Sequence, residues 1–191
     1  FFEVYLKPKV YIETERLIIR QWLKEDLNYF FRMNSNPEVM KYFPKLLSRE
    51  ESDSFVERAS AQIDKKGYSF WALELKENSK FVGTMGVNNV NFKEHFTPAV
   101  EIGWRLDNNL WRQGLGFEGA ISILDYAFYS LMLKEVVAFT SKINGPSIGL
   151  MEKIGMQRDK NGDFDHPNVE RKSPLNRHVL YRISYRENRK N

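Results

Sequence analysis

The sequence predicts a mixed α/β (α+β) domain with a mostly antiparallel sheet. Three strand-like segments follow one another at residues 68–75, 81–90 and 99–106, and helices and strands alternate after them. Successive strands favour an antiparallel meander, whereas a strand–helix–strand order predicts a parallel crossover. The chain has 191 residues without an internal repeat or low-complexity linker, which predicts one domain, 1–191, with its core at about 12–185.

The chain is expected to begin with a strand and a helix. Residues 15–22 are typical of a strand, and residues 24–34 are typical of a helix. The apolar residues of that helix recur at spacings of three and four, at Leu27, Phe30 and Phe31.

A second helix is predicted over residues 48–66. Ser48 is its expected N-cap, and Glu51 completes a capping box with it. Gly67 is the expected stop, because glycine is common just after a helix C-terminus.

The remaining elements are shorter. Asn78-Ser79 favours a hairpin turn between the first two strands of the meander. The later elements are expected as a helix, a strand, a helix and a strand, at residues 114–131, 136–140, 146–153 and 177–184.

Composition restricts the chemistry. The chain has no Cys, which excludes a disulfide framework, a thiolate nucleophile and Cys-ligated zinc. Its net charge of +4 favours an anionic ligand, but no nucleic-acid-binding motif accompanies the charge. No apolar run approaches the roughly 20 residues that span a bilayer, and Phe1 to Tyr5 lack a leader pattern. We expect a cytoplasmic protein without a membrane partner and without direct nucleic-acid binding; the oligomeric state stays open.

A glycine-rich segment at residues 111–120 lies between a predicted strand and a predicted helix. Glycines let the backbone approach a ligand closely, and the N-terminus of a helix favours a phosphate. Arg112 adds a positive charge. We interpret the segment as a phosphate-binding loop; the alternative is a plain glycine turn that starts a helix.

Two other nucleotide-binding motifs agree less well with this segment. Gly114, Gly116 and Gly119 match G-x-G-x-x-G, but residues 107–113 separate them from the preceding strand. A dinucleotide-binding fold also needs an acidic residue after the next strand, whereas the candidate in this chain, Glu135, precedes that strand. No Lys-Ser/Thr pair follows the glycines, which excludes a P-loop.

Five short motifs follow one another along the chain. They are TERLIIR at 14–20, FVGTMG at 81–86, EIGW at 101–104, WRQGLG at 111–116, and NGPS with EKIGM within 144–156. The series resembles the GNAT superfamily of acetyl-CoA-dependent N-acetyltransferases, most closely its Rim-type branch of ribosomal-protein N-terminal acetyltransferases. The loop matches the GNAT motif Gln/Arg-x-x-Gly-x-Gly/Ala except at its first position, where Trp is frequent in the Rim-type branch.

The resemblance implies a GNAT fold, with about six to seven strands in one sheet flanked by about four helices. It also implies acetyl-CoA as cosubstrate, and no metal. In the family, the loop amides bind the pyrophosphate, a splayed strand pairs with the pantetheine arm, and a later helix start lies beside the sulfur. The residues so implied are Trp104, Arg105, Leu106, Arg112, Gln113, Gly114, Leu115, Gly116, Phe117, Asn144 and Ser147.

The implied chemistry is direct attack of an amine on the thioester. A free α-amine has a pKa of about 8 and must lose a proton to attack. Glu101 is the candidate base, on the strand face opposite Ile102; its alternative role is an ion pair on a wet face. Ser147 is the candidate acid for the leaving thiolate, or else structural. Asn144 is expected to cap a helix, to contact the cofactor, or to do both.

Other polar clusters favour structural roles. Residues 159–170 partly imitate a calcium loop, but Phe164 stands where the loop needs Gly. His95, His166 and His178 lack the spacing of a metal site, although His166 has the alternative of bordering the acceptor site. Six aromatic residues near the first helix, where the family builds its acceptor groove, are expected mainly in the core. They are Trp22, Tyr29, Phe30, Phe31, Tyr42 and Phe43.

The branch resemblance favours a protein N-terminus as the acceptor, which is an argument by analogy of fold. The first alternative is a small-molecule amine such as a polyamine or an antibiotic. The second is a non-catalytic CoA-binding domain that acts as a sensor or scaffold.

Overall fold

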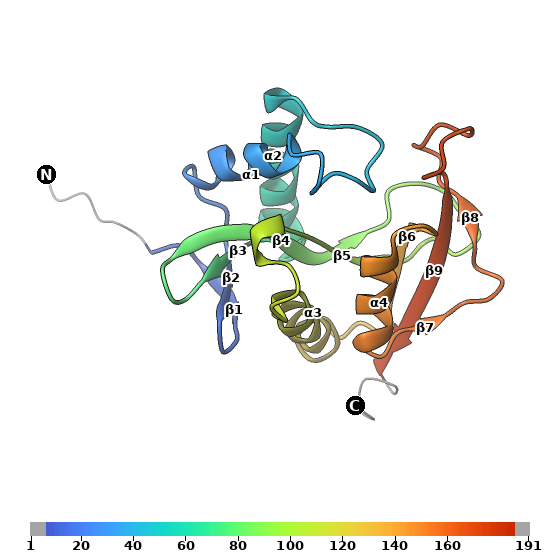
Figure 1. Cartoon of the computed structure of the whole chain (residues 1–191). Helices are drawn as coiled ribbons and strands as arrows, with labels where there is room; N and C mark the ends of the chain where they lie inside the picture. The colour runs from blue at the N-terminus through green and yellow to red at the C-terminus, as the bar shows by residue number, and fades with distance from the viewer. Residues whose placement is uncertain (1–6, 186–191) are drawn as a thin grey trace, which may run out of the picture.

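The computed structural model describes residues 7–185, so residues 1–6 and 186–191 of the predicted domain lie outside the described residues (Figure 1). The strands are β1 Val10–Glu13, β2 Leu17–Arg20, β3 Phe70–Leu75, β4 Lys80–Asn89, β5 Val100–Leu106, β6 Glu135–Ser141, β7 Gln157–Arg158, β8 Phe164–Asp165 and β9 Arg177–Ser184. The helices are α1 Asp26–Asn34, α2 Arg49–Lys66, α3 Leu115–Asp125 and α4 Gly145–Lys153.

One mixed sheet with the order β1-β2-β3-β4-β5-β6-β9-β7, to which β8 adds beside β9, organises the molecule. The predicted antiparallel meander β3-β4-β5 is confirmed, and β5 and β6 form the predicted parallel pair. The sheet has nine strands, so the expectation of six to seven was too low. The additional strands β1, β7 and β8 have only four, two and two residues, too few to display an alternating pattern.

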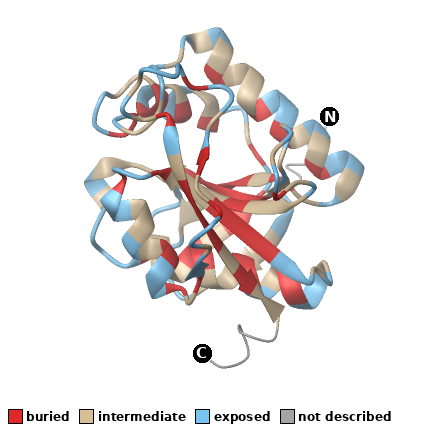
Figure 2. Cartoon of the chain, turned by 90° about the vertical axis from the view of Figure 1, so that its right-hand side faces the viewer, coloured by how far each residue is buried: buried red, intermediate tan, exposed pale blue. Residues whose placement is uncertain are grey.

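Two helical layers enclose the sheet. In Figure 1, α1 and α2 lie on one side of the central strands, and α3 and α4 lie on the other. Figure 2 shows buried residues running along the crossing strands, while the outer faces of the helices are exposed. Trp71, Leu73 and Met85 are fully buried at the centre, and burying one such side chain stabilises the fold by about 1.5–3 kcal/mol.

The predicted signals at α2 are confirmed. The Ser48 side chain accepts the Glu51 N–H, and the Glu51 side chain accepts the Ser48 N–H, which completes the capping box. Gly67 ends the helix with a left-handed φ of 86°.

The helix predicted over residues 114–131 is interrupted near its end. It consists of α3 and a following π-helical turn, Tyr126–Ser130. Within residues 7–185, no helix combines the length and the apolar character that a membrane crossing requires.

Candidate active site

The sheet opens between β5 and β6. These strands are paired at a single register position, Glu101 opposite Val137, whereas β5 pairs with β4 along its whole length. Beyond Glu101, the β5 backbone edge that faces β6 therefore has no ladder partner in the described sheet. Such an edge offers N–H and C=O groups to an extended ligand.

The N-terminus of α3 presents free backbone donors beside this opening. The first bond of the helix runs from the Glu118 N–H to the Gly114 carbonyl, at 3.0 Å. The N–H groups of Leu115, Gly116 and Phe117 consequently have no partner inside the helix, and no side chain caps it. Gly114 has a left-handed φ of 82°, which favours glycine there.

Gly116 keeps this helix start close to its neighbours. A Cβ at Gly116 would lie 3.3 Å from a Leu150 methyl carbon and 3.4 Å from a Leu106 methyl carbon. A larger residue would therefore crowd the entrance between β5 and α4. The free N–H donors and the absence of a side chain at Gly116 together suit an anionic group that lies against the backbone at the start of α3.

A polar network ties the glycine loop to the start of the sheet. Arg16 donates from Nη1 to the Gln113 carbonyl at 2.8 Å and from Nε to Glu118 at 2.7 Å. Glu118 also accepts the Thr14 hydroxyl at 2.6 Å. Burial alone would raise the pKa of Glu118, but the hydrogen bonds from Thr14 and Arg16 lower it overall. The TERLIIR motif thus positions the loop, a role that the motif alone did not reveal.

Side chains alternate across the sheet along β5. Glu101 and Arg105 share the face of α1 and α2, with Gly103 between them, and Trp104 lies on the face of α4. A Cβ at Gly103 would lie 2.9 Å from the Phe70 ring, so the glycine admits Phe70. A cavity of about 450 Å³ opens here, and all of these residues line it.

Glu101 has no charged partner in the cavity. Among residues 7–185, no ion pair and no hydrogen bond to its side chain is present, so the expected alternative of an ion pair on a wet face does not describe its surroundings. Burial raises the pKa of Glu101 to about 8. The carboxyl group is therefore mainly protonated at neutral pH and close to its midpoint at slightly alkaline pH.

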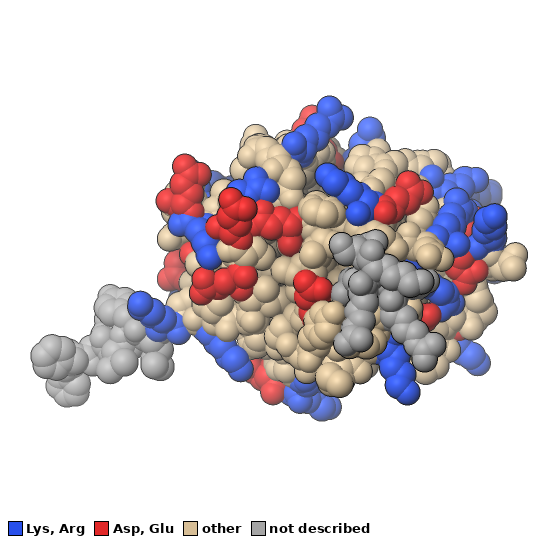
Figure 3. All heavy atoms as spheres, turned by 90° about the horizontal axis from the view of Figure 1, so that it is seen from below, with Lys and Arg blue, Asp and Glu red and all other residues tan. Residues whose placement is uncertain are grey.

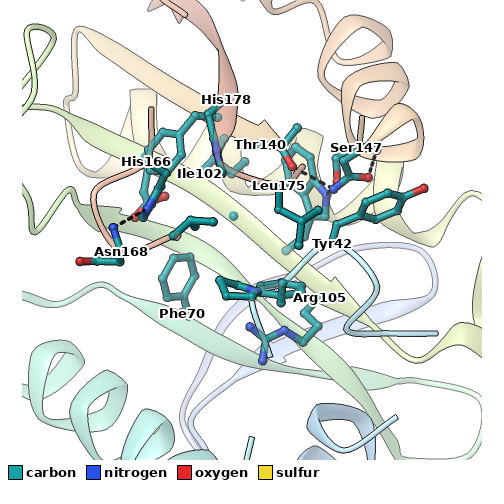
Figure 4. A pocket seen from close by; sticks show the side chains of 18 of the residues that line it. Tyr42, Phe70, Ile102, Arg105, Thr140, Ser147, His166, Asn168, Leu175 and His178 are labelled. Carbon is teal, nitrogen blue, oxygen red and sulfur yellow. Dashed lines mark hydrogen bonds between the residues drawn. The ribbon is translucent and has the colours of Figure 1, made fainter. Parts of the chain in front are cut away.

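Ser147 and Asn144 lie at the start of α4, beside the opening (Figure 4). The Trp104 Nε1–H donates to Ser147 Oγ at 3.3 Å. Asn144 accepts the Ser147 N–H at 3.3 Å and donates to Thr140 Oγ1 at 2.9 Å. Asn144 therefore caps the helix and lines the cavity, so both of its expected roles are structurally compatible.

The predicted cofactor residues do not all point the same way. The Arg105 side chain packs over the Phe43 ring, 4.2 Å from its centroid. Burial lowers the pKa of Arg105 to about 10, so it remains a cation at neutral pH. Gln113 donates to the Asn109 carbonyl at 3.1 Å, and Arg112 is exposed. Leu106 accepts the Trp111 indole N–H at 3.0 Å.

Several cavity residues escaped sequence reasoning. His178 lines the cavity beside His166, for which the sequence analysis gave the alternative of bordering the acceptor site, and their ring centroids are 4.8 Å apart. Phe70, Phe92 and Phe139 also line it. The only sequence signal was the position of His166 near the expected acceptor site, since strand pairing over long separations brings the others together.

The remaining expectations have mixed outcomes. Tyr42 and Phe43 line the cavity, whereas Trp22 and Phe30 are buried in the core and Tyr29 is 54% exposed. The carboxylates of the calcium-like segment bind arginines: Asp159 accepts from Arg182 and Asp163 accepts from Arg158.

Comparisons with known proteins agree with this geometry. The model of the acetyltransferase (GNAT) domain family matches residues 16–157. The uncharacterized N-acetyltransferase YnaD of Bacillus subtilis is 30% identical over 151 residues, which are 78% of this chain and 84% of that protein.

Two solved structures are similar as well. A GNAT-family acetyltransferase of Bacillus anthracis superposes with a TM-score of 0.76 at 28% identity, over 92% of this chain and 99% of that one. The spermidine N-acetyltransferase of Vibrio cholerae, solved with CoA and spermine, reaches 0.71 at 16% identity over 90% and 97%, a likeness of fold alone.

Proposed function

The chain belongs to the acetyltransferase (GNAT) domain family and is an acyltransferase, and from this premise we propose that it transfers an acetyl group from acetyl-CoA to a primary amine by direct attack in a ternary complex. One observation carries the proposal. The sheet parts between β5 and β6, with a helix N-terminus on one side of the opening and a half-buried carboxyl group, that of Glu101, on the other.

The residues at the opening are suited to acetyl-CoA, the cosubstrate of the family. We assign the pyrophosphate to the free N–H groups at the start of α3, which supply fixed partial positive charge without a mobile cation. Arg112 and Gln113 flank it. The pantetheine arm is assigned to the open edge of β5, at Trp104 to Leu106. The thioester then reaches the cavity from the α4 side.

Glu101 is assigned as the base for the acceptor amine. Its raised pKa of about 8 is close to that of an α-amine, so a proton passes between them with little cost in either direction. The amine nitrogen then attacks the thioester carbon. A backbone N–H on the splayed strand is our candidate donor to the oxyanion.

Ser147 is assigned as the donor to the leaving thiolate. As the C–S bond breaks, the sulfur takes the electron pair and needs a proton or a hydrogen bond. Ser147 accepts from Trp104, which leaves its own O–H free to donate. A thiol has a reference pKa of about 8.5, so this assistance need only be modest.

Two classes of acceptor are candidates. The Rim-type motifs support a protein N-terminus, and this assignment rests on the sequence resemblance. A small-molecule amine is the second candidate, because a fold neighbour is a spermidine N-acetyltransferase. A third, non-catalytic role as a CoA-binding sensor or scaffold predicts binding without turnover.

The test begins with calorimetric titration of acetyl-CoA, with NAD and calcium as controls. We expect micromolar affinity, about −7 to −8 kcal/mol. Incubation with acetyl-CoA and a peptide, spermidine or an aminoglycoside follows, with free CoA thiol and product mass as readouts. The chain has no Cys, so a thiol reagent reports CoA alone. Binding without transfer to any amine would support the non-catalytic role.

A further inference from the structure

One wall of the cavity beside Glu101 consists of aromatic and imidazole rings. Phe92 lies 5.6 Å from Phe139 and 4.8 Å from His166 between ring centroids, and His166 lies 4.8 Å from His178. Figure 4 shows the two histidines together on the side of the cavity away from Arg105. Phe139 and His178 belong to β6 and β9, whereas Phe92 and His166 belong to two loops, one after β4 and one after β8.

Both histidines on this wall are neutral at neutral pH. Burial lowers the pKa of His166 to about 4, with a further decrease from His178 and a small opposing effect of Glu94. Burial also lowers the pKa of His178. The His178 Nδ1–H donates to the Asn176 carbonyl at 2.9 Å, and His166 Nδ1 accepts the Asn168 N–H at 3.2 Å. The wall therefore adds ring surface without adding charge.

The opposite wall is also aromatic. It comprises Tyr42 and Phe43 from the segment between α1 and α2, Phe55 from α2 and Phe70 from β3. Phe55 and Phe70 are stacked, with ring centroids 5.9 Å apart. An acceptor that enters the cavity thus meets rings on two sides.

The charged groups of the cavity are few. Among its lining residues within 7–185, only Glu101 is acidic and only Arg105 is a permanent cation. Arg105 has no acidic partner there: it packs against the rings of Phe43 and Phe55 and donates to Asn34. In Figure 4 its guanidinium end points away from His178 and Ser147.

We propose that the acceptor is a small amine that carries a single positive charge on an aromatic body, and that Arg105 disfavours polycations. The inference rests on the proposed function and narrows its acceptor. One ammonium group is favoured by the faces of the surrounding rings and has Glu101 as its proton acceptor. Each further positive charge needs its own carboxylate once water is excluded, and this cavity supplies Arg105 instead.

An amine panel with the whole chain and acetyl-CoA tests the proposal. The probes are 2-phenylethylamine, ethylamine, spermidine and a peptide with an N-terminal serine, and the readout is release of CoA thiol. We expect kcat/KM for 2-phenylethylamine to exceed that for spermidine by at least about 10-fold, the effect of one unpaired buried charge. Equal or faster transfer to spermidine or to the peptide overturns the acceptor but leaves the proposed function intact. Acetyl-CoA binding without transfer to any probe overturns both.

Two phenylalanines of the same cluster form a matched pair of variants. Phe92 lines the cavity, whereas Phe96 packs in the same cluster but is not among the lining residues. Phe92→Leu is expected to raise the KM for 2-phenylethylamine about 2- to 10-fold, because one aromatic contact typically contributes about that factor to binding. The KM for ethylamine should not change. Phe96→Leu should leave both values unchanged, and equal effects of the two variants contradict the proposal.

Arg105→Met tests the exclusion of polycations. It removes the charge and keeps a flexible apolar stem against the Phe43 ring. The ratio of kcat/KM for spermidine to that for 2-phenylethylamine should rise, because the repelling charge is gone. An unchanged ratio in a folded variant refutes the role of Arg105. If thermal melting shows that the variant is unfolded, the amine panel and the Phe92→Leu pair still decide the acceptor.

Discussion

Glu101 and Arg105 lie four residues apart on one face of β5, and both are half-buried without an ion pair between them. Burial therefore raises the pKa of the carboxyl group and lowers that of the guanidinium. Burying much of an ionisable group without an opposite charge beside it costs stability, and sites that bear this cost are often functional. The two residues are thus the strongest single-residue signs of an active site.

Replacing Glu101 tests its role as the base. Glu101→Gln is expected to lower turnover roughly 10²–10⁴-fold with little change in acetyl-CoA affinity. Because the active form is the deprotonated carboxylate, the wild-type rate should rise with pH through about 8. Steady-state kinetics across this range check both statements. Glu94→Gln, outside the cavity lining, is the control, and an unchanged rate in Glu101→Gln at saturating substrates removes Glu101 from this role.

The same pKa shift predicts how stability depends on pH. The folded carboxyl group holds its proton up to about pH 8, whereas the unfolded group releases it near 4.5. Its contribution to stability is therefore fully present below about pH 4.5 and is lost as the pH rises to about 8. Glu101→Gln cannot ionise, so it should melt at a higher temperature than the wild type above pH 8, with a smaller difference near pH 4.5. A difference in melting temperature that does not vary with pH contradicts the raised pKa of Glu101.

Sequence reasoning reached some of these residues and not others. The alternation of β5 put Glu101 on the face opposite Ile102, as observed. It could not predict that no cation would stand nearby, because this depends on which side chains α1 and α2 bring to that face. His166 and His178 lie on a loop and on β9, and their proximity depends on pairing between β8 and β9.

At the scale of the element, the N-terminus of α3 is the feature that local sequence predicted best. The motif predicted its glycines, its position after a strand and its free amides. The sequence predicted the capping box of α2 equally well, because a cap is a contact between residues that are close in the chain. Short edge strands such as β7 and β8 form only when β9 is present to pair with them, so local patterns missed them.

Two glycines with similar backbones separate a loop effect from a general loss of stability. Gly114 and Gly67 have φ values of 82° and 86°, one at the start of α3 and the other at the end of α2. Alanine at either position is strained and should lower the melting temperature. Gly114→Ala should also weaken acetyl-CoA binding about 10-fold or more, because the amides shift. Gly67→Ala should bind normally by calorimetry, and equal losses in both variants contradict the loop assignment.

The Arg16–Glu118 contact extends this element to the first strands. Arg16 holds the Gln113 carbonyl, and Glu118 holds Arg16 in place. Glu118→Gln keeps the shape of the side chain and removes its charge. We expect a higher KM for acetyl-CoA with kcat little changed, because the loop is less well positioned while the cavity residues are untouched. Steady-state kinetics at varied acetyl-CoA measure this split, and a fall in kcat alone contradicts it.

On the scale of the whole molecule, the charge of +4 does not form a single basic face in the view of Figure 3, where Lys and Arg lie interspersed with Asp and Glu. Attraction of an anionic cosubstrate by such a surface is weak and screened by salt. The fixed amides at α3 act at contact distance, where salt screens less. Affinity for acetyl-CoA should therefore decrease only modestly as ionic strength rises.

Acetyl-CoA should also stabilise the molecule against heat, because its proposed site joins β5, α3 and α4 across the opening in the sheet. A ligand at about 100 times its dissociation constant adds about 2.7 kcal/mol to the folded state. For a chain of 191 residues, this corresponds to a rise in melting temperature of about 5–10 °C. Glu101→Gln should show the full rise, since Glu101 acts on the acceptor. Gly114→Ala should show a smaller rise at the same concentration, and a full rise in that variant would place the cosubstrate elsewhere.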